Sequence, residues 1–206
     1  MSLRVFVDIE SLPPDKEDLT RFPKVSEACK SDEERYRRLA LDADYGRILT
    51  IGVIVERDGH INLQGCFGRD RKTAGFHLDE AKTLKGFWKL LFDFDARRDI
   101  IVGHNIYSFD LPFIYKRSVI HRVQVPVVLS FARYRSQPLF DTMHEWNRWD
   151  LKKYTALDDL ARILGLESSK TDHINGAHVY DRFCEGGRYW LKSHVMTLTD
   201  YWHGLS

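Results

Sequence analysis

The sequence contains little cysteine and no long apolar run. Its three cysteines, Cys29, Cys66 and Cys184, are odd in number and far apart, and no CxxC pair occurs. This pattern favours free thiols in a reducing compartment over a disulfide framework. No apolar stretch approaches the roughly 20 residues that a membrane-spanning helix needs. The chain enters an apolar strand pattern at Leu3–Val7 without the features of a secretory signal, so we expect a cytoplasmic protein without membrane contact.

An excess of charge of one sign is also lacking. The chain carries 31 Lys and Arg against 30 Asp and Glu, a net charge of +1, so overall charge indicates no partner. Hydrophobic content of 43% and charged content of 30% are those of a globular protein. A chain of 206 residues can bury a core of its own, and we expect residues 1–206 to form a single domain.

Acidic residues are absent from one long segment. Between Leu111 and Phe140 no Asp or Glu occurs, whereas basic residues are interleaved with aromatic ones. Such a segment is able to follow a phosphate backbone and stack bases. A solvated surface with a few packed aromatic side chains is the alternative. The residues concerned are Lys116, Arg117, Arg122, Arg133 and Arg135, with Tyr115, Phe131 and Tyr134.

Apolar periodicity indicates both strands and helices. An Asp58-Gly59 turn predicts a hairpin between the second and third strands, and Ser108 and Thr155 are placed to cap two helices. The order of elements implies an α/β fold, a mixed five-stranded sheet with helices packed on its faces. The expected strands are 3–10, 47–57, 61–67, 100–104 and 138–141, and the expected helices lie within 33–41, 78–94, 109–117, 155–165, 176–184 and 189–202.

Acids follow two of the apolar strands. Asp8 and Glu10 stand two residues apart at the end of the first strand, so their side chains point to the same side. Carboxylates that face one way repel each other unless a cation lies between them, and hard divalent cations prefer oxygen ligands. A strand end that opens into water is the alternative. Asp110 follows the fourth strand in the first turn of a helix, where an acid also interacts favourably with the helix dipole.

Together these residues resemble the motifs of a known family. Asp8-Ile9-Glu10 is similar to the first motif of the DnaQ-like (DEDD) 3′–5′ exonucleases, and Asn105-Ile-Tyr-Ser-Phe109-Asp110 is similar to the second. The phrase GHNIYSFDLPFI resembles the branch related to the proofreading exonuclease domain of family B DNA polymerases. Later segments look like the same branch at the expected intervals, namely Phe140–Met143, Leu157–Gly165 and Gly176–Asp181.

The resemblance implies a ribonuclease H-like fold and hydrolysis assisted by two Mg²⁺ or Mn²⁺ ions. By that resemblance, Asp8 would bridge both ions, Glu10 would help to hold one and orient the attacking water, and Asp110 would support the other. The expected reaction removes nucleoside 5′-monophosphates from the 3′ end of single-stranded DNA, with RNA as an alternative substrate. The expected substrate contacts are at Ile9, Leu12, Asn105 and Phe109.

The third motif of the family departs from its pattern in this chain. The family has Tyr-x-x-x-Asp or His-x-x-x-x-Asp on a late helix, and neither spacing occurs in residues 189–202. His194 is a candidate for orienting water or replacing a ligand, because neutral imidazole also binds Mn²⁺; a hydrogen-bonded helix residue is the alternative. Asp200 is the nearest downstream acid and a candidate metal ligand. Asp141 and Asp181 are possible compensating acids, although Asp181 fits a helix surface better.

The altered third motif leaves two classes of function open. The first and second motifs favour a metal-dependent exonuclease. Loss of one of four carboxylates would weaken one metal site, which favours instead a nucleic-acid-binding domain of the same fold without turnover. The residues give no sign of 2′-hydroxyl recognition.

Overall fold

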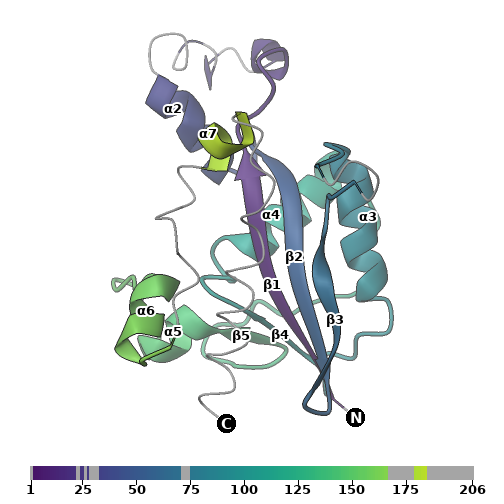
Figure 1. Cartoon of the computed structure of the whole chain (residues 1–206), viewed down its shortest axis with the longest axis vertical. Helices are drawn as coiled ribbons and strands as arrows, with labels where there is room; N and C mark the ends of the chain where they lie inside the picture. The colour runs from purple at the N-terminus through teal and green to yellow at the C-terminus, as the bar shows by residue number, and fades with distance from the viewer. Residues whose placement is uncertain are drawn as a thin grey trace.

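Five strands form one mixed sheet in the computed structural model, which describes residues 2–21, 24, 25, 27, 33–70, 75–166 and 179–184 (Figure 1). The strands are β1 Leu3–Leu12, β2 Arg47–Arg57, β3 His60–Phe67, β4 Ile100–Gly103 and β5 Leu139–Asp141. Their spatial order is β3-β2-β1-β4-β5. The pairs β3–β2 and β2–β1 are antiparallel, whereas β1–β4 and β4–β5 are parallel. The expected mixed sheet is therefore confirmed.

Helices follow or connect the strands. In the described part of the chain, no helix is long and apolar enough to cross a bilayer. The helix expected at 189–202 lies outside the described residues. The helices are α2 Glu33–Arg38, α3 Glu80–Leu90, α4 Asp110–Ile120, α5 Thr142–Trp146, α6 Leu157–Ile163 and α7 Val179–Cys184, with 3-10 turns at Asp18–Arg21 and Leu39–Leu41.

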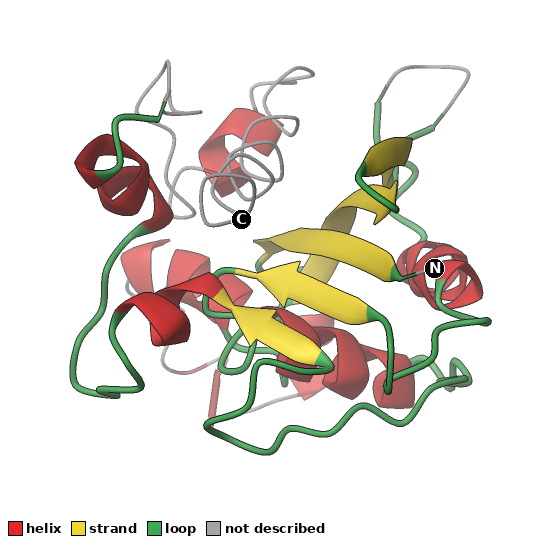
Figure 2. Cartoon of the chain, turned by 90° about the horizontal axis from the view of Figure 1, so that it is seen from below, coloured by secondary structure: helices red, strands yellow, loops and turns green. Residues whose placement is uncertain are grey.

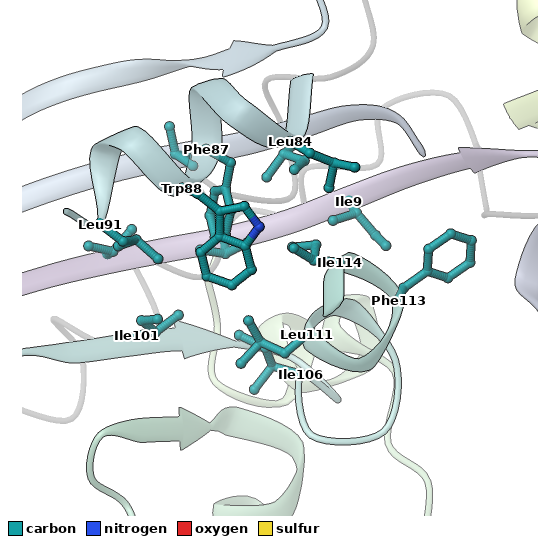
Figure 3. Packing of buried hydrophobic residues seen from close by; sticks show 14 of the residues in the cluster. Ile9, Leu84, Phe87, Trp88, Leu91, Ile101, Ile106, Leu111, Phe113 and Ile114 are labelled. Carbon is teal, nitrogen blue, oxygen red and sulfur yellow. The ribbon is translucent and has the colours of Figure 1, made fainter. Parts of the chain in front are cut away.

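The larger core lies between one face of the sheet and helices α3 and α4 (Figure 3). Alternate residues of β1, Val5, Val7 and Ile9, point into this core, as the two-residue period of a strand requires. Phe6 instead packs on the opposite face with residues of β2 and β4. The alternation therefore places Asp8 and Glu10 on the face of Phe6, opposite to Val5, Val7 and Ile9.

The hairpin between β2 and β3 forms as the sequence predicted. Asp58 and Gly59 have φ angles of 51° and 83°, and two successive residues with positive φ produce the tight turn whose twist matches the paired strands. Asp58 and Gly59 thus set the register by which β2 and β3 extend the sheet on its antiparallel side.

Two expected helix caps are wrong. The backbone N–H groups of Ser108 and Phe109 both donate to the carbonyl of Asn105, and this turn makes Phe109, rather than Ser108, the residue before α4. Helix α6 begins at Leu157, and its N-cap is Ala156. The hydroxyl of Thr155 donates instead to Asn147 Oδ1 at 3.1 Å. A local turn at Asn105 displaces the first cap, and a side-chain contact with Asn147 displaces the second.

The acid-free segment 111–140 divides into a packed part and an exposed part. Arg117 is 7% exposed and its guanidinium pairs with the carboxylate of Glu80, so it cannot follow a phosphate backbone. Lys116 is paired with Asp44, with 2.8 Å between Nζ and Oδ1. Arg133 and Arg135, by contrast, belong to an exposed loop. Of the five basic residues of the segment, Arg122, Arg133 and Arg135 are therefore the exposed ones without a carboxylate partner among the described residues.

Candidate active site

The three parallel strands direct their carboxyl ends to the same edge of the sheet. Strand β1 ends beyond Asp8 and Glu10, β4 leads into the loop before Asp110, and β5 ends at Asp141. Functional groups of α/β proteins gather at such carboxyl ends. A β-bulge follows Glu10, where the pairing of β1 with β2 shifts its register. Figure 2 shows the sheet from below, where the arrowheads of the three parallel strands point to one side.

Asp110 joins the first acidic pair through a backbone hydrogen bond. The amide of Ile9, the residue between Asp8 and Glu10, donates to Asp110 Oδ1 at 3.0 Å. Asp110 is 3% exposed, Glu10 is buried, and Asp8 is half-buried. Two motifs that lie a hundred residues apart in the sequence therefore meet at one point in the structure.

The pKa of Asp110 is raised by its burial and by the neighbouring acids. Burial, followed by the negative charge of Asp8, raises the pKa of Asp110 well above its usual value, and Asp141 adds to this effect. The N–H groups of Ile9 and of Asp110 itself act in the opposite direction. A buried carboxylate among other carboxylates is costly in its charged form, and a bound cation would remove that cost.

Asp141 holds the loop that precedes Asp110. Its Oδ1 accepts from the backbone N–H of Asn105 at 3.0 Å, Met143 at 3.0 Å and His144 at 3.2 Å, and its Oδ2 accepts from Tyr107 at 3.2 Å. Asp141 is 1% exposed. These bonds tie the β4–α4 loop to the first turn of α5, so Asp141 is a positioning residue for the site.

A close approach at Gly103 fixes the path of the same loop. A Cβ atom at Gly103 would lie 2.7 Å from the Cβ of Ile106, a distance that real side chains do not reach. Ile106 is fully buried, and its carbonyl accepts the N–H of Leu111 in α4 at 3.2 Å. The end of β4 is thus packed directly against the residue that connects to the first turn of α4.

The donor atoms suit a hard divalent cation. Asp8, Glu10 and Asp110 offer carboxylate oxygens, which Mg²⁺ and Mn²⁺ prefer over softer ligands. Among the residues that the structure describes, no group of three or more His, Cys, Asp or Glu is arranged to hold an ion. The raised pKa of Asp110 nevertheless indicates at least a pair of interacting acids. His194 and Asp200, the candidates from the third motif, lie outside the described residues.

The expected substrate positions differ in their exposure. Ile9 and Leu12 are 4% and 1% exposed and pack in two different apolar clusters. Asn105 is half-buried with a φ of 61°, and Phe109 is half-buried against Phe113, with ring centroids 5.6 Å apart. Contact of these four residues with a substrate stays a prediction; Asn105 and Phe109 have accessible surface for it, whereas the side chains of Ile9 and Leu12 are occupied by the core.

Asp181 lies on α7, where it pairs with Arg37 across 3.0 Å. Its half-buried position on a helix surface agrees with the interpretation that the sequence favoured. The carboxylate already has a cationic partner, so Asp181 is a weaker candidate than Asp141 for replacing a missing acid.

One feature next to the carboxylates was not predicted. A hollow of about 170 Å³ is lined chiefly by Tyr107, Phe131, Arg133, His144 and Trp149, and we call it the aromatic pocket. The aromatic content of 131–134 was visible in the sequence. The contribution of His144 and Trp149 was not, because it depends on how α5 and its following turn pack against the β4–α4 loop.

The fold and the acids at its parallel edge define a protein with a ribonuclease H-like fold. The model of the RNase H superfamily matches residues 40–198. The chain therefore belongs to the RNase H superfamily. Comparison with curated proteins gives no match.

Comparison with solved structures finds similar chains at low sequence identity. The family B DNA polymerase from the hyperthermophilic archaeon Pyrobaculum calidifontis aligns with a TM-score of 0.61 and 19% identity, over 98% of this chain and 24% of the polymerase. E. coli exonuclease I in complex with a dT13 oligonucleotide aligns with a TM-score of 0.45 and 14% identity, over 100% of this chain and 45% of the exonuclease. This chain thus spans less than half of either protein. The expected ribonuclease H-like fold is therefore confirmed.

Proposed function

We propose that this chain is a metal-dependent 3′–5′ exonuclease that releases nucleoside 5′-monophosphates from the 3′ ends of single-stranded DNA. The hydrogen bond from the Ile9 amide to Asp110 supports this proposal most, because it brings the acids of two separate motifs to one edge of the sheet. Membership of the RNase H superfamily agrees with it. Perturbed carboxylates at the carboxyl ends of parallel strands are typical of catalytic sites.

In this proposal Asp8, Glu10 and Asp110 hold two Mg²⁺ or Mn²⁺ ions. When bound, the ions would stabilise negative charge on the reacting phosphate and make a water molecule more acidic. Burial keeps bulk water away from Asp110, so its charge acts strongly on a neighbouring cation. The bond from Ile9 fixes the orientation of that carboxylate. His194 and Asp200 are the candidates for orienting water and for a fourth ligand.

A 5′-labelled single-stranded DNA incubated with Mg²⁺ or Mn²⁺ tests the proposal. We expect a ladder that shortens from the 3′ end. The variant Asp8→Ala should slow it at least about a hundredfold, because a metal contribution of several kcal/mol corresponds to that loss. Asp93→Ala, which removes an exposed acid near the end of α3, is the matched control and should cut at the normal rate. Equal rates for the two variants would contradict the proposal.

A single-stranded RNA of the same sequence tests the choice of substrate. If RNA is digested faster than DNA, the chain is an exonuclease that acts on RNA with the same acids. Slower digestion of the RNA would support DNA as the substrate.

A nucleic-acid-binding domain without turnover is the second candidate. It is favoured by the altered third motif and by the lack of a three-residue metal cluster among the described residues. Under this alternative, the unmodified chain would bind the labelled strand and leave it intact with either metal. A ladder that is lost in Asp8→Ala would exclude it.

A further inference from the structure

The walls of the aromatic pocket are formed by rings that pack against each other. Trp149 stacks on His144 with centroids 4.9 Å apart and planes 27° apart, and it meets Tyr107 edge-on at 5.3 Å. Phe131 extends the wall from the other side, 6.4 Å from Tyr107. Aromatic rings are the side chains on which nucleobases stack without regard to sequence.

Tyr107 is fixed before any ligand arrives. Its hydroxyl donates to the carbonyl of Arg135 at 3.0 Å, and its backbone N–H donates to Asp141 Oδ2 at 3.2 Å. Burial, with the charges of Asp141 and Glu145, raises the pKa of Tyr107 to about 12, so the phenol stays neutral. A preorganised ring loses little conformational freedom when a ligand stacks on it.

His144 supplies a polar group that lacks a partner. The residue is 5% exposed and lines the pocket, and its Nδ1 has no hydrogen-bond partner among the described residues. Buried polar atoms are nearly always satisfied, so an exception requires an explanation. An imidazole nitrogen donates or accepts according to its tautomer. Because Nδ1 is itself inaccessible, a ligand in the pocket meets the ring of His144 rather than this atom.

Size and charge limit the ligand further. The volume of about 170 Å³ is smaller than the roughly 300–1,000 Å³ of pockets that enclose a whole drug-sized ligand, so the pocket holds one ring rather than a complete nucleotide. Arg133, which lines the pocket from an exposed loop, can contact a phosphate attached to that ring. A planar heterocycle with a phosphate outside the pocket is the ligand that fits.

The pocket adjoins the carboxylate site. Tyr107 belongs to the loop that leads into Asp110, and Asp141 binds the backbone of both Tyr107 and His144. We propose that the aromatic pocket receives one unpaired nucleobase of the strand whose end lies at Asp8, Glu10 and Asp110, with Arg133 on an adjacent phosphate. This inference rests on the proposed exonuclease function and adds a second site along the strand.

Binding measurements with abasic strands test the pocket. A single abasic residue is moved through a single-stranded DNA, and affinity is measured in EDTA so that no strand is cut. At one position the abasic residue should weaken binding about five- to one-hundredfold, the range given by one base–aromatic stack. In Trp149→Ala the intact strand should bind more weakly by a similar factor, and the abasic residue at that position should have no further effect.

Matched variants separate the pocket from general effects. Trp146→Ala removes a neighbouring tryptophan that does not line the pocket and should keep the full abasic effect. Trp149→Phe, which retains a stacking face, should recover part of the affinity. An abasic effect that persists unchanged in Trp149→Ala at every position overturns the proposal.

The exposed cation gives a second test that does not perturb the fold. Arg133→Ala should lower the salt dependence of binding by about one phosphate contact. Arg57→Ala, at the opposite end of the sheet, should leave it unchanged. If affinity depends on salt concentration equally in Arg133→Ala and in the unmodified chain, Arg133 does not contact a phosphate. If the chain binds with this pattern but cuts no DNA, the exonuclease proposal fails and the pocket stands; if it cuts DNA without the pattern, only the pocket fails.

Discussion

Buried carboxylates lie at both ends of helix α4, and their surroundings are opposite. Beside the C-terminal end, Glu80 of α3 accepts from Arg117 Nε and Nη2 at 2.9 and 2.7 Å, from the amide of Ile48 at 2.7 Å, and lies 2.7 Å from His121 Nε2. At the N-terminal end, Asp110 accepts the amide of Ile9, and the charges that act on it most are those of other acids.

The charge of Glu80 is compensated by its partners and stabilises the fold, whereas the charge of Asp110 destabilises the folded chain. A buried carboxylate with a two-point guanidinium partner and a backbone donor is compensated, although removing one member leaves the other unpaired. A buried carboxylate beside like charges destabilises its charged form and is typical of functional sites. The two ends of α4 should therefore respond to substitution in opposite directions.

The largest effect is expected at the compensated end. Glu80→Ala leaves the guanidinium of Arg117 buried without its partner and should lower the free energy of unfolding by about 3–5 kcal/mol, measured by urea denaturation. Adding Arg117→Met should recover part of the loss. Glu34→Ala, which removes an exposed pair with Arg38, is the control and should cost about 0.5 kcal/mol or less. If Glu80→Ala lowers the free energy of unfolding as little as Glu34→Ala does, Glu80 does not stabilise the fold in the way described.

Substitution at the other end should reduce activity without reducing stability. Asp110→Asn keeps an oxygen that accepts the Ile9 amide but removes the buried charge. The rate of 3′-end digestion should fall at least about a hundredfold, while the free energy of unfolding in EDTA should rise. A variant that loses stability along with activity would show that Asp110 is a structural acid like Glu80.

Divalent cations should stabilise the folded chain through Asp110 at the N-terminal end of α4, and not through Glu80 at the C-terminal end. At a concentration about a hundred times the Kd, a metal that binds only the folded chain adds about 2.7 kcal/mol to the free energy of unfolding. The melting temperature should therefore rise with Mg²⁺ or Mn²⁺ in the unmodified chain and stay nearly constant in Asp110→Asn. An equal rise in both would place the cation elsewhere.

The smallest effect is expected in the pH dependence of stability. The pKa of Asp110 is raised in the folded chain, so above the usual Asp value the folded chain keeps a proton that the unfolded chain has lost. In EDTA, the free energy of unfolding of the unmodified chain therefore falls as the pH rises from the usual pKa of Asp to the raised pKa of Asp110. The stability difference between Asp110→Asn and the unmodified chain should grow with pH and be least below about pH 3.9. A difference that does not change with pH would contradict this assignment.

Local patterns were sufficient to predict much of the sheet and the first acids. The apolar run of β2 was bounded correctly at Arg47 and Arg57, and the Asp58-Gly59 turn fixed the hairpin. The two-residue strand period placed Asp8 and Glu10 on one face. The position of Asp110 beside them followed from a motif resemblance, because no local rule connects residues separated by a hundred positions.

Contacts between distant segments account for what the sequence did not predict. Arg117 belongs to a segment for which the sequence left two alternatives open, a surface that follows a phosphate backbone and a solvated surface. It is neither, because Glu80, 37 positions earlier, pairs with it in the interior. The cap positions of Ser108 and Thr155 were lost to a turn and to a contact with Asn147. The aromatic pocket joins residues from 107 to 151. The Arg117 pair and the pocket depend on packing that a short sequence window does not contain. The turn at Asn105 is local, but the cap pattern did not reveal it.

Because Gly103 contacts Ile106 closely, a substitution at Gly103 would alter the position of the residues at the site. An added methyl group at 103 would have to displace Ile106, whose carbonyl is bonded to the start of α4. The acid that begins that helix would be carried along. Under the proposed function, a genetic screen for chains that still fold but no longer digest DNA should therefore recover changes at position 103, although Gly103 is buried.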